Sequence, residues 1–155
     1  ENYTLRERLM YLGLPAPLFT IDLDTEMGRR ISRHAFQRFF DCLEPAFGLQ
    51  VTLGQVNPVV VCPALTSHSE LSDEALRQAG SSLTTIRIAV GDEDPRGLLA
   101  HLMQAAELAL EPECPGFSRH FGQPQAIDAL YESTYVDVHR RYAASRPRMQ
   151  QMLSP

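Results

Sequence analysis

The sequence predicts an α/β fold of the α+β type, in which helices pack on one face of a small mixed sheet. Residues 18–24 alternate apolar and polar side chains, as expected of a half-buried strand. After them the periodicity indicates a helix, two short strands, a short helix, a strand and a helix. The length of 155 residues suits one compact domain. These observations favour a single sheet with its helices on one side.

Two helices and a strand are expected before residue 50. Leucines at helical spacing predict a first helix over residues 3–11. In the strand at residues 18–24, two sets of side chains face opposite ways: Phe19, Ile21 and Leu23 against Thr20, Asp22 and Asp24. A helix is then expected to begin at Thr25 and to end before Pro45, with a wide apolar stripe: Met27, Ile31, Ala35, Phe36, Phe39, Phe40 and Leu43.

The middle of the chain carries short elements. Residues 50–53 and 59–62 predict two strands around a turn at residues 54–58. Ser72 can cap a short helix, which Gly80 ends. These elements extend the sheet and lead into its last strand.

That last strand is predicted over residues 83–90. Asp94 as N-cap and Pro95 at the first helical position then begin a helix. Its apolar stripe is expected to face the core: Leu98, Leu99, Leu102, Ala105, Ala106 and Ala109.

The end of the chain differs in character. A proline-rich segment makes a break, and an amphipathic helix follows, which Pro147 interrupts. Its apolar side holds Ile127, Leu130, Tyr131, Tyr135, Val138 and Tyr142. We therefore divide the chain into an N-terminal helix at residues 1–14, a small domain at residues 15–111 and a helical extension at residues 112–155.

The composition excludes several classes of function. A net charge of −5 and a pI near 5.5 argue against a nucleic-acid surface, because such surfaces usually carry a basic face. No apolar run approaches the roughly 20 residues that span a bilayer. Cys42, Cys62 and Cys114 are odd in number and form no CxxC pair, which indicates buried thiols in a reducing compartment. We expect a cytoplasmic protein with neither a nucleic-acid nor a membrane partner.

The sequence gives little support for a metal site. Its five histidines form no HExxH or HxH pattern, whereas zinc needs three or four convergent ligands. Asp92, Glu93 and Asp94 precede a helix N-terminus, where the helix dipole favours negative charge. A structural role therefore explains these acids better than acid–base catalysis does, and we expect no metal.

Arg87 is the most informative side chain. In the strand at residues 83–90, Ile86 and Ile88 share the face expected in the core, and Arg87 lies on the other face. A guanidinium can donate two parallel hydrogen bonds to a carboxylate, a geometry that lysine cannot reproduce. Arg87 either binds a ligand carboxylate in this way or forms a structural pair across the sheet with an acid such as Asp22. Periodicity alone favours the structural pair.

Four segments in order resemble one enzyme family. Residues 84–94, TTIRIAVGDED, are similar to the RlSvGiEd segment of the Cys/Met-metabolism enzymes that depend on pyridoxal 5′-phosphate (PLP), the cystathionine γ-synthase/lyase and O-acetylhomoserine sulfhydrylase-like family. Residues 51–57 resemble that family's SLGgvE turn, and residues 62–69, CPALTSHS, resemble its HPAsmTHs segment. The strand at residues 18–24 and the Phe-rich helix after it resemble the start of the family's small domain. The resemblance implies the C-terminal small domain of a fold-type I PLP enzyme, with a mainly antiparallel sheet.

The resemblance also implies roles for single residues. The family's arginine in this last strand binds the α-carboxylate of the amino-acid substrate, and it corresponds to Arg87. The serine that opens the SLG turn lies beside the same carboxylate and corresponds to Thr52, which keeps the hydroxyl. The family's TH pair becomes Ser67 and His68, again with a hydroxyl. Its histidine before the proline is replaced by Cys62.

The chain contains no lysine, because all 14 of its Lys and Arg residues are arginine. PLP enzymes hold their cofactor as a Schiff base on a lysine amine. We therefore expect no catalytic or cofactor-binding residue here, and an inactive isolated chain. The resemblance implies that a missing N-terminal large domain carries the lysine and PLP, with an amino-acid substrate and a homo-oligomer, dimer or tetramer.

The predicted function is thus the substrate-carboxylate-binding domain of a transsulfuration-type enzyme, a lyase or transferase. It would act by elimination or replacement on cysteine, cystathionine or activated homoserine. The alternative is a stand-alone amino-acid-binding or oligomerisation module without catalysis, because one fold hosts many functions.

Overall fold

The computed structural model describes residues 10, 16–23, 31–51 and 53–152, without the side chains of residues 146–152. Almost all of the helix expected at residues 3–11, the expected helix start at Thr25, and Thr52 lie outside the described residues. The chain divides into two compact units. One is Pro17–Phe121, and the other combines Glu1–Ala16 with Gly122–Pro155.

A four-stranded sheet is the framework of the unit Pro17–Phe121. Its strands are β1 (Leu18–Asp22), β2 (Gly48–Leu49), β3 (Val59–Val61) and β4 (Thr85–Ala89). They lie in the order β1-β4-β3-β2, where β4 is antiparallel to both of its neighbours and β2 is parallel to β3. The sheet is therefore mixed and mainly antiparallel, which confirms the predicted fold class.

The register between β1 and β4 shows which side chains face the core. Phe19 and Ile21 of β1 lie opposite Ile88 and Ile86 of β4. Both isoleucines are buried within the hydrophobic core. Because side chains alternate along a strand, Arg87 lies on the other face of the sheet, as its position between the two isoleucines predicts.

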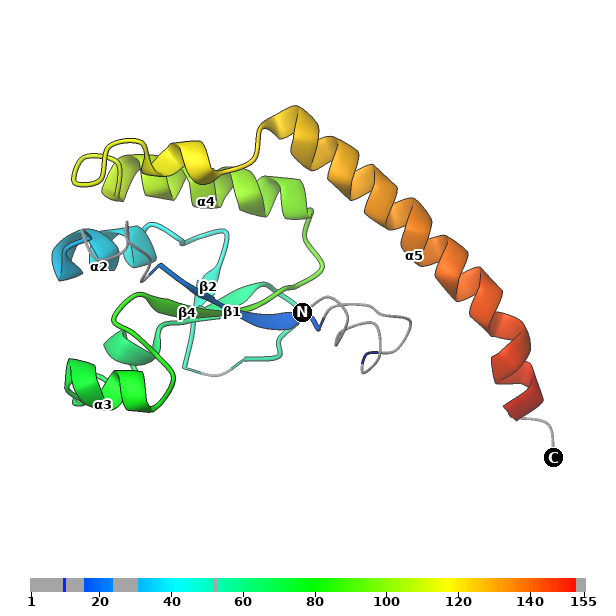
Figure 1. The fold of residues 1–155 in the computed structure, drawn as a ribbon, viewed down its shortest axis with the longest axis horizontal. Helices are drawn as coiled ribbons and strands as arrows, with labels where there is room; N and C mark the ends of the chain where they lie inside the picture. Colours follow the sequence, from blue (N-terminus) through cyan, green and yellow to red (C-terminus); the bar gives the residue numbers. More distant parts are fainter. Residues whose placement is uncertain (1–9, 11–15, 24–30, 52, 153–155) are drawn as a thin grey trace. The chain divides into compact units, whose positions relative to one another are not determined.

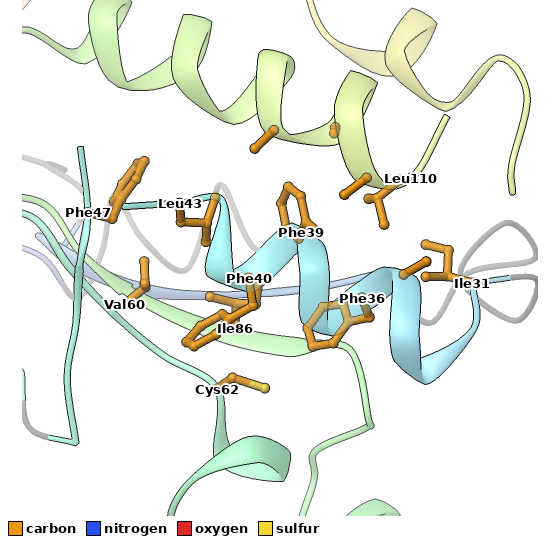
Figure 2. Close-up of a cluster of buried hydrophobic side chains, with 14 of the residues drawn as sticks. Ile31, Phe36, Phe39, Phe40, Leu43, Phe47, Val60, Cys62, Ile86 and Leu110 are labelled. Carbon is orange, nitrogen blue, oxygen red and sulfur yellow. The ribbon is translucent and has the colours of Figure 1, made fainter. Parts of the chain in front are cut away.

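Helices α2 (Arg33–Asp41) and α4 (Pro95–Ala109) cover one face of the sheet, with α2 between α4 and the strands (Figure 1). Figure 2 shows Phe39 of α2 directed towards Leu110 at the end of α4, whereas Phe36 and Phe40 are directed towards Ile86 on the sheet. These three phenylalanines are at most 5% exposed. Each such side chain contributes about 1.5–3 kcal/mol to stability by its removal from water, so α2 provides much of the core.

Two of the helices have the capping residues that the sequence predicts. The Ser72 hydroxyl accepts a hydrogen bond from the Ala75 N–H (3.3 Å) at the start of α3 (Asp73–Gln78). Gly80 follows this helix with a φ of 74°, a left-handed conformation that favours glycine. The Asp94 carboxylate accepts from the Arg96 N–H (2.9 Å) and begins α4. Figure 1 shows α3 on the other side of the sheet from α2 and α4, so the expectation that the helices lie on one face was wrong for α3.

Three local predictions were wrong. Ile31 and Ser32 are not helical, because the Ser32 hydroxyl accepts from the Ala35 N–H (3.1 Å) and makes Ser32 the N-cap of α2. Residues 50, 51 and 53 are not strand; the strand of this region is β2, which precedes them and pairs in parallel with β3. Pro147 does not interrupt α5 (Pro124–Met152), since a proline inside a helix can bend it without ending it.

Two 3-10 helices complete the unit Pro17–Phe121, η3 (Pro63–Leu65) and η4 (Phe117–His120). The thiols of Cys62 and Cys114 are free and buried, and that of Cys42 is free and half-buried. Cys114 and Phe117 belong to the same core as α2 and α4. Within the described residues, no helix is long and apolar enough to cross a membrane.

Candidate functional site

Arg87 lies at the middle of the sheet. Its Cα partners are Thr20 in β1 and Val61 in β3, so strands flank it on both sides. The side chain is half-buried, and its guanidinium belongs to the face opposite the hydrophobic core. An arginine held on the central strand of a sheet has a well-defined position, which a selective binding group requires.

The structural pair between Arg87 and Asp22 is not formed. Asp22 lies opposite Thr85, and its carboxylate accepts hydrogen bonds from the hydroxyls of three residues: Ser82 (2.7 Å), Thr84 (3.1 Å) and Thr85 (2.6 Å). Among the residues that the structure describes, no carboxylate forms an ion pair with Arg87. Asp22 therefore does not occupy the N–H donors of the Arg87 guanidinium on this face of the sheet.

The carboxylate of Asp22 is the centre of a hydroxyl cluster that was not predicted from the sequence. Besides its contacts to Asp22, the Ser82 hydroxyl accepts from the Thr84 N–H (3.0 Å), and the Thr85 hydroxyl accepts from the Ser82 N–H (2.6 Å). Ser82, Thr84 and Thr85 are all buried, and buried polar groups need such partners. The run GSSLTT before the strand is the signal that could have predicted it. The hydrogen bonds of this cluster join the start of β4 to the end of β1.

A close backbone contact holds the loop between β2 and β3 against the end of β4. A Cβ atom at Gly91 would lie 2.4 Å from the Pro58 nitrogen and 2.4 Å from the Val56 oxygen. The Asp92 N–H also donates to the Val56 carbonyl (3.1 Å). This loop contains Thr52, which lies outside the described residues, and the contact places its C-terminal part beside the strand that carries Arg87.

The segment after β3 contains Ser67. It begins at Val61, the Cα partner of Arg87, and turns through η3, where the Thr66 hydroxyl donates to the Cys62 carbonyl (2.8 Å). Ser67 is exposed, and its hydroxyl is 2.7 Å from Nδ1 of His68. No hydrogen bond joins Ser67 to Arg87 among the described residues.

Cys62 is unsuited to a reactive role. Its side chain is buried at the start of η3, and this burial raises the pKa of the thiol. A buried thiol with a raised pKa stays protonated, whereas nucleophilic and metal-binding cysteines act as thiolates. In the described part of the chain, no three His, Cys, Asp or Glu side chains are grouped as a metal site would require.

The comparisons with known proteins indicate the same family as the resemblance in the sequence. No family model matches the chain. The homocysteine synthase of Schizosaccharomyces pombe is 39% identical over 57 residues, which are 37% of this chain and 13% of that enzyme. The chain is similar to the Cys/Met-metabolism PLP enzymes. The match confirms the resemblance for part of the chain. The chain spans only a small part of the length of this relative.

Solved structures with similar segments carry names from the same family. An assigned O-acetylhomoserine (thiol)-lyase from Campylobacter jejuni, which contains a pyridoxyl-lysine phosphate, is 32% identical with a TM-score of 0.47 over 58% of this chain and 20% of its own. The cystathionine γ-synthase of Xanthomonas oryzae, solved with cystathionine, is 27% identical with a TM-score of 0.47 over 59% and 22%. The cystathionine γ-lyase of Micromonospora echinospora is 38% identical with a TM-score of 0.43 over 47% and 19%.

The residues of this chain do not fit a covalent PLP site. PLP enzymes bind the cofactor through a lysine amine. All 14 Lys and Arg residues here are arginine, and a guanidinium does not form that Schiff base. The Arg87 guanidinium can still donate two parallel hydrogen bonds to a carboxylate.

Proposed function

We propose that this chain supplies the substrate-carboxylate site of a PLP-dependent enzyme of cysteine and methionine metabolism. Its substrate would be cysteine, cystathionine or an activated homoserine, and the reaction an elimination or a replacement. The observation that carries the proposal is Arg87, a half-buried guanidinium on the central strand, within the segment that resembles the family.

The surroundings of Arg87 suit the binding of a carboxylate. Two parallel N–H donors match the two oxygens of an α-carboxylate, and a charge-assisted contact of this kind is about twice as strong as a neutral hydrogen bond. Partial burial between β1 and β3 strengthens it further, because the local dielectric constant is lower than in water. Hydroxyls from Thr52 and Ser67 are proposed as additional ligands of the same carboxylate.

The lysine and PLP are proposed to belong to a large domain in the same polypeptide or assembly. Arg87 would then orient the amino-acid substrate towards that domain, which lowers the entropic part of the barrier. We accordingly propose that the isolated chain is inactive and that the complete enzyme is a cytoplasmic homo-oligomer.

The test compares Arg87→Ala with Arg77→Ala in the complete encoded polypeptide. Loss of one partner of a desolvated charge pair costs about 2–5 kcal/mol, so Arg87→Ala should raise KM for the amino acid by about 30-fold or more. Arg77 is exposed on α3, and its replacement should leave KM unchanged. PLP absorbance should persist in both variants.

Two outcomes would contradict the proposal. One is loss of PLP from Arg87→Ala with an unchanged KM, which would assign the arginine to the cofactor. The other is an encoded polypeptide and assembly without any PLP-binding lysine. In that case stoichiometric binding of an amino acid by this chain, abolished in Arg87→Ala, would establish the alternative of a binding module without catalysis.

A further inference from the structure

Thr20 is the residue of β1 that lies opposite Arg87. Their Cα atoms are partners in the antiparallel register of β1 and β4. The Val90 N–H donates to the Pro17 carbonyl (2.8 Å), so these two residues form a hydrogen-bonded pair of the same ladder. Such pairs recur at every second residue, and Thr20 is three residues after Pro17, which makes Thr20 and Arg87 a non-hydrogen-bonded pair. In a pair of this kind the side chains come close together, with Cβ atoms about 4.5–5.5 Å apart.

The Thr20 hydroxyl lies on the same face of the sheet as the Arg87 guanidinium, because Cα partners project to the same side. Thr20 is exposed and Arg87 is half-buried. In the described part of the chain, no hydrogen bond involves the Thr20 hydroxyl or the Arg87 guanidinium. The hydroxyls of Thr84 and Thr85 differ in this respect, since they are buried and donate to the Asp22 carboxylate.

The other neighbour of Arg87 offers no hydroxyl. Val61 of β3 is its Cα partner on that side, and this apolar side chain is only 5% exposed. Of the two Cα partners, Thr20 is therefore the one that can donate a hydrogen bond to a ligand of Arg87. It does so from β1, which lies at the edge of the sheet.

We propose that the Thr20 hydroxyl binds the substrate carboxylate together with the Arg87 guanidinium. This inference rests on the function proposed for Arg87 and adds a third donor to its site. The guanidinium donates two parallel hydrogen bonds from β4 to the two carboxylate oxygens, and the hydroxyl donates to one of these oxygens from β1. Each carboxylate oxygen can accept more than one hydrogen bond. The bound carboxylate thus bridges the edge strand and the central strand.

Strand propensity offers a competing explanation of Thr20. Threonine is favoured in strands because its β-branched side chain suits a pleated surface. Valine is favoured for the same reason and has nearly the same shape, but it has no hydroxyl. Thr20→Val therefore separates the two explanations. Propensity predicts no change in ligand binding, whereas a contact with the ligand predicts weaker binding.

The test measures the binding of propionate, a carboxylate without an amine, to the complete encoded polypeptide. The broadening of the carboxylate carbon-13 NMR signal of propionate gives its Kd. Thr20→Val should raise this Kd about tenfold, because it removes one hydrogen bond to a charged acceptor. Thr20→Ser keeps the hydroxyl and should stay within about threefold of the parent. For the amino-acid substrate, Thr20→Val should raise KM about tenfold and leave kcat within about threefold, since the carboxylate is bound equally in the ground and transition states.

The outcomes distinguish this inference from the proposed function. Parent-like binding by Thr20→Val, with binding lost in Arg87→Ala, would overturn the role of Thr20 and leave the Arg87 site intact. Binding by Thr20→Ser as weak as that by Thr20→Val would also overturn it, because the hydroxyl would then not be the group that binds. A fall in the free energy of unfolding that accounts for the weaker binding of Thr20→Val would assign Thr20 a structural role instead. Parent-like binding by Arg87→Ala would overturn both proposals.

Discussion

Gly91 is the position where a single methyl group should have the largest effect on the Arg87 region. Its backbone is not in the left-handed region, since the described glycines with positive φ are Gly54, Gly80 and Gly116. Alanine can therefore adopt the conformation of Gly91, and the cost of Gly91→Ala is purely steric. The contacts at 2.4 Å are to backbone atoms of Val56 and Pro58, which cannot rotate away as a flexible side chain can.

The magnitude follows from the displacement that the methyl group requires. Carbon contacts are comfortable from about 3.5 Å, so the loop must move by about 1 Å. Overpacking of this kind costs about 1–3 kcal/mol. The shift also disturbs the hydrogen bond from the Asp92 N–H to the Val56 carbonyl (3.1 Å), worth about 1 kcal/mol. We expect Gly91→Ala to lower the free energy of unfolding by about 2–4 kcal/mol.

Urea denaturation of the two variants Gly91→Ala and Gly97→Ala provides the assay. Nothing lies within 4 Å of a Cβ atom at Gly97, and this glycine is inside α4. Gly97→Ala should therefore raise stability by up to about 1 kcal/mol, because alanine favours the helix. If the free energy of unfolding of Gly91→Ala is within about 0.5 kcal/mol of that of the parent chain, with the same m value, the loop does not pack against β4 as described.

Two further changes test other contacts of the same unit. Asp22→Ala should lower the free energy of unfolding by about 2–4 kcal/mol, because it leaves the buried hydroxyls of Thr84 and Thr85 without their acceptor; Asp22→Asn, which keeps an acceptor oxygen, should cost less in the same urea titration. Glu111 accepts hydrogen bonds from the N–H groups of Ser118 and Gly116, which lower the pKa of its carboxyl. The stabilising effect of the Glu111 carboxylate is therefore present above the ordinary glutamate pKa of about 4.3 and is lost as the pH falls through the lowered value. The free energies of unfolding of Glu111→Gln and of the parent chain, measured from pH 7 to pH 3, should therefore converge at the acid end. A difference that stays constant with pH would contradict this role.

Local patterns in the sequence were sufficient to predict most of the helices and strands. The alternation around β1 and β4, the Ser72 cap, the Gly80 terminator and the Asp94 cap depend on neighbours within a few residues, and all are present in the structure. Strands β1 and β4 could be predicted for the same reason, because each is recognisable from its own period.

The features that the sequence did not reveal depend on contacts between distant residues. Ser32 lies within the stretch expected to form one helix, and its hydroxyl and N–H donate to the Glu113 carboxylate (3.0 and 3.2 Å), 81 residues away. The strand β2 has only two residues and is defined by pairing with β3 rather than by a period of its own. The face of the sheet on which Arg87 lies could be predicted from the alternation along the strand. That Arg87 does not pair with Asp22 could not, because it depends on the hydroxyls that bind the Asp22 carboxylate.

The bond between Ser32 and Glu113 has a consequence for the shortest piece of this chain that can fold. A fragment that stops at residue 111 would keep strands β1 to β4 but would lack the Glu113 acceptor at the start of α2, as well as Cys114 and Phe117 from the core. Removing a large buried aromatic ring alone costs about 3–5 kcal/mol, comparable with the whole stability of a small domain. Expression trials should therefore end no earlier than Phe121, and during synthesis the core is complete only after this last segment has left the ribosome.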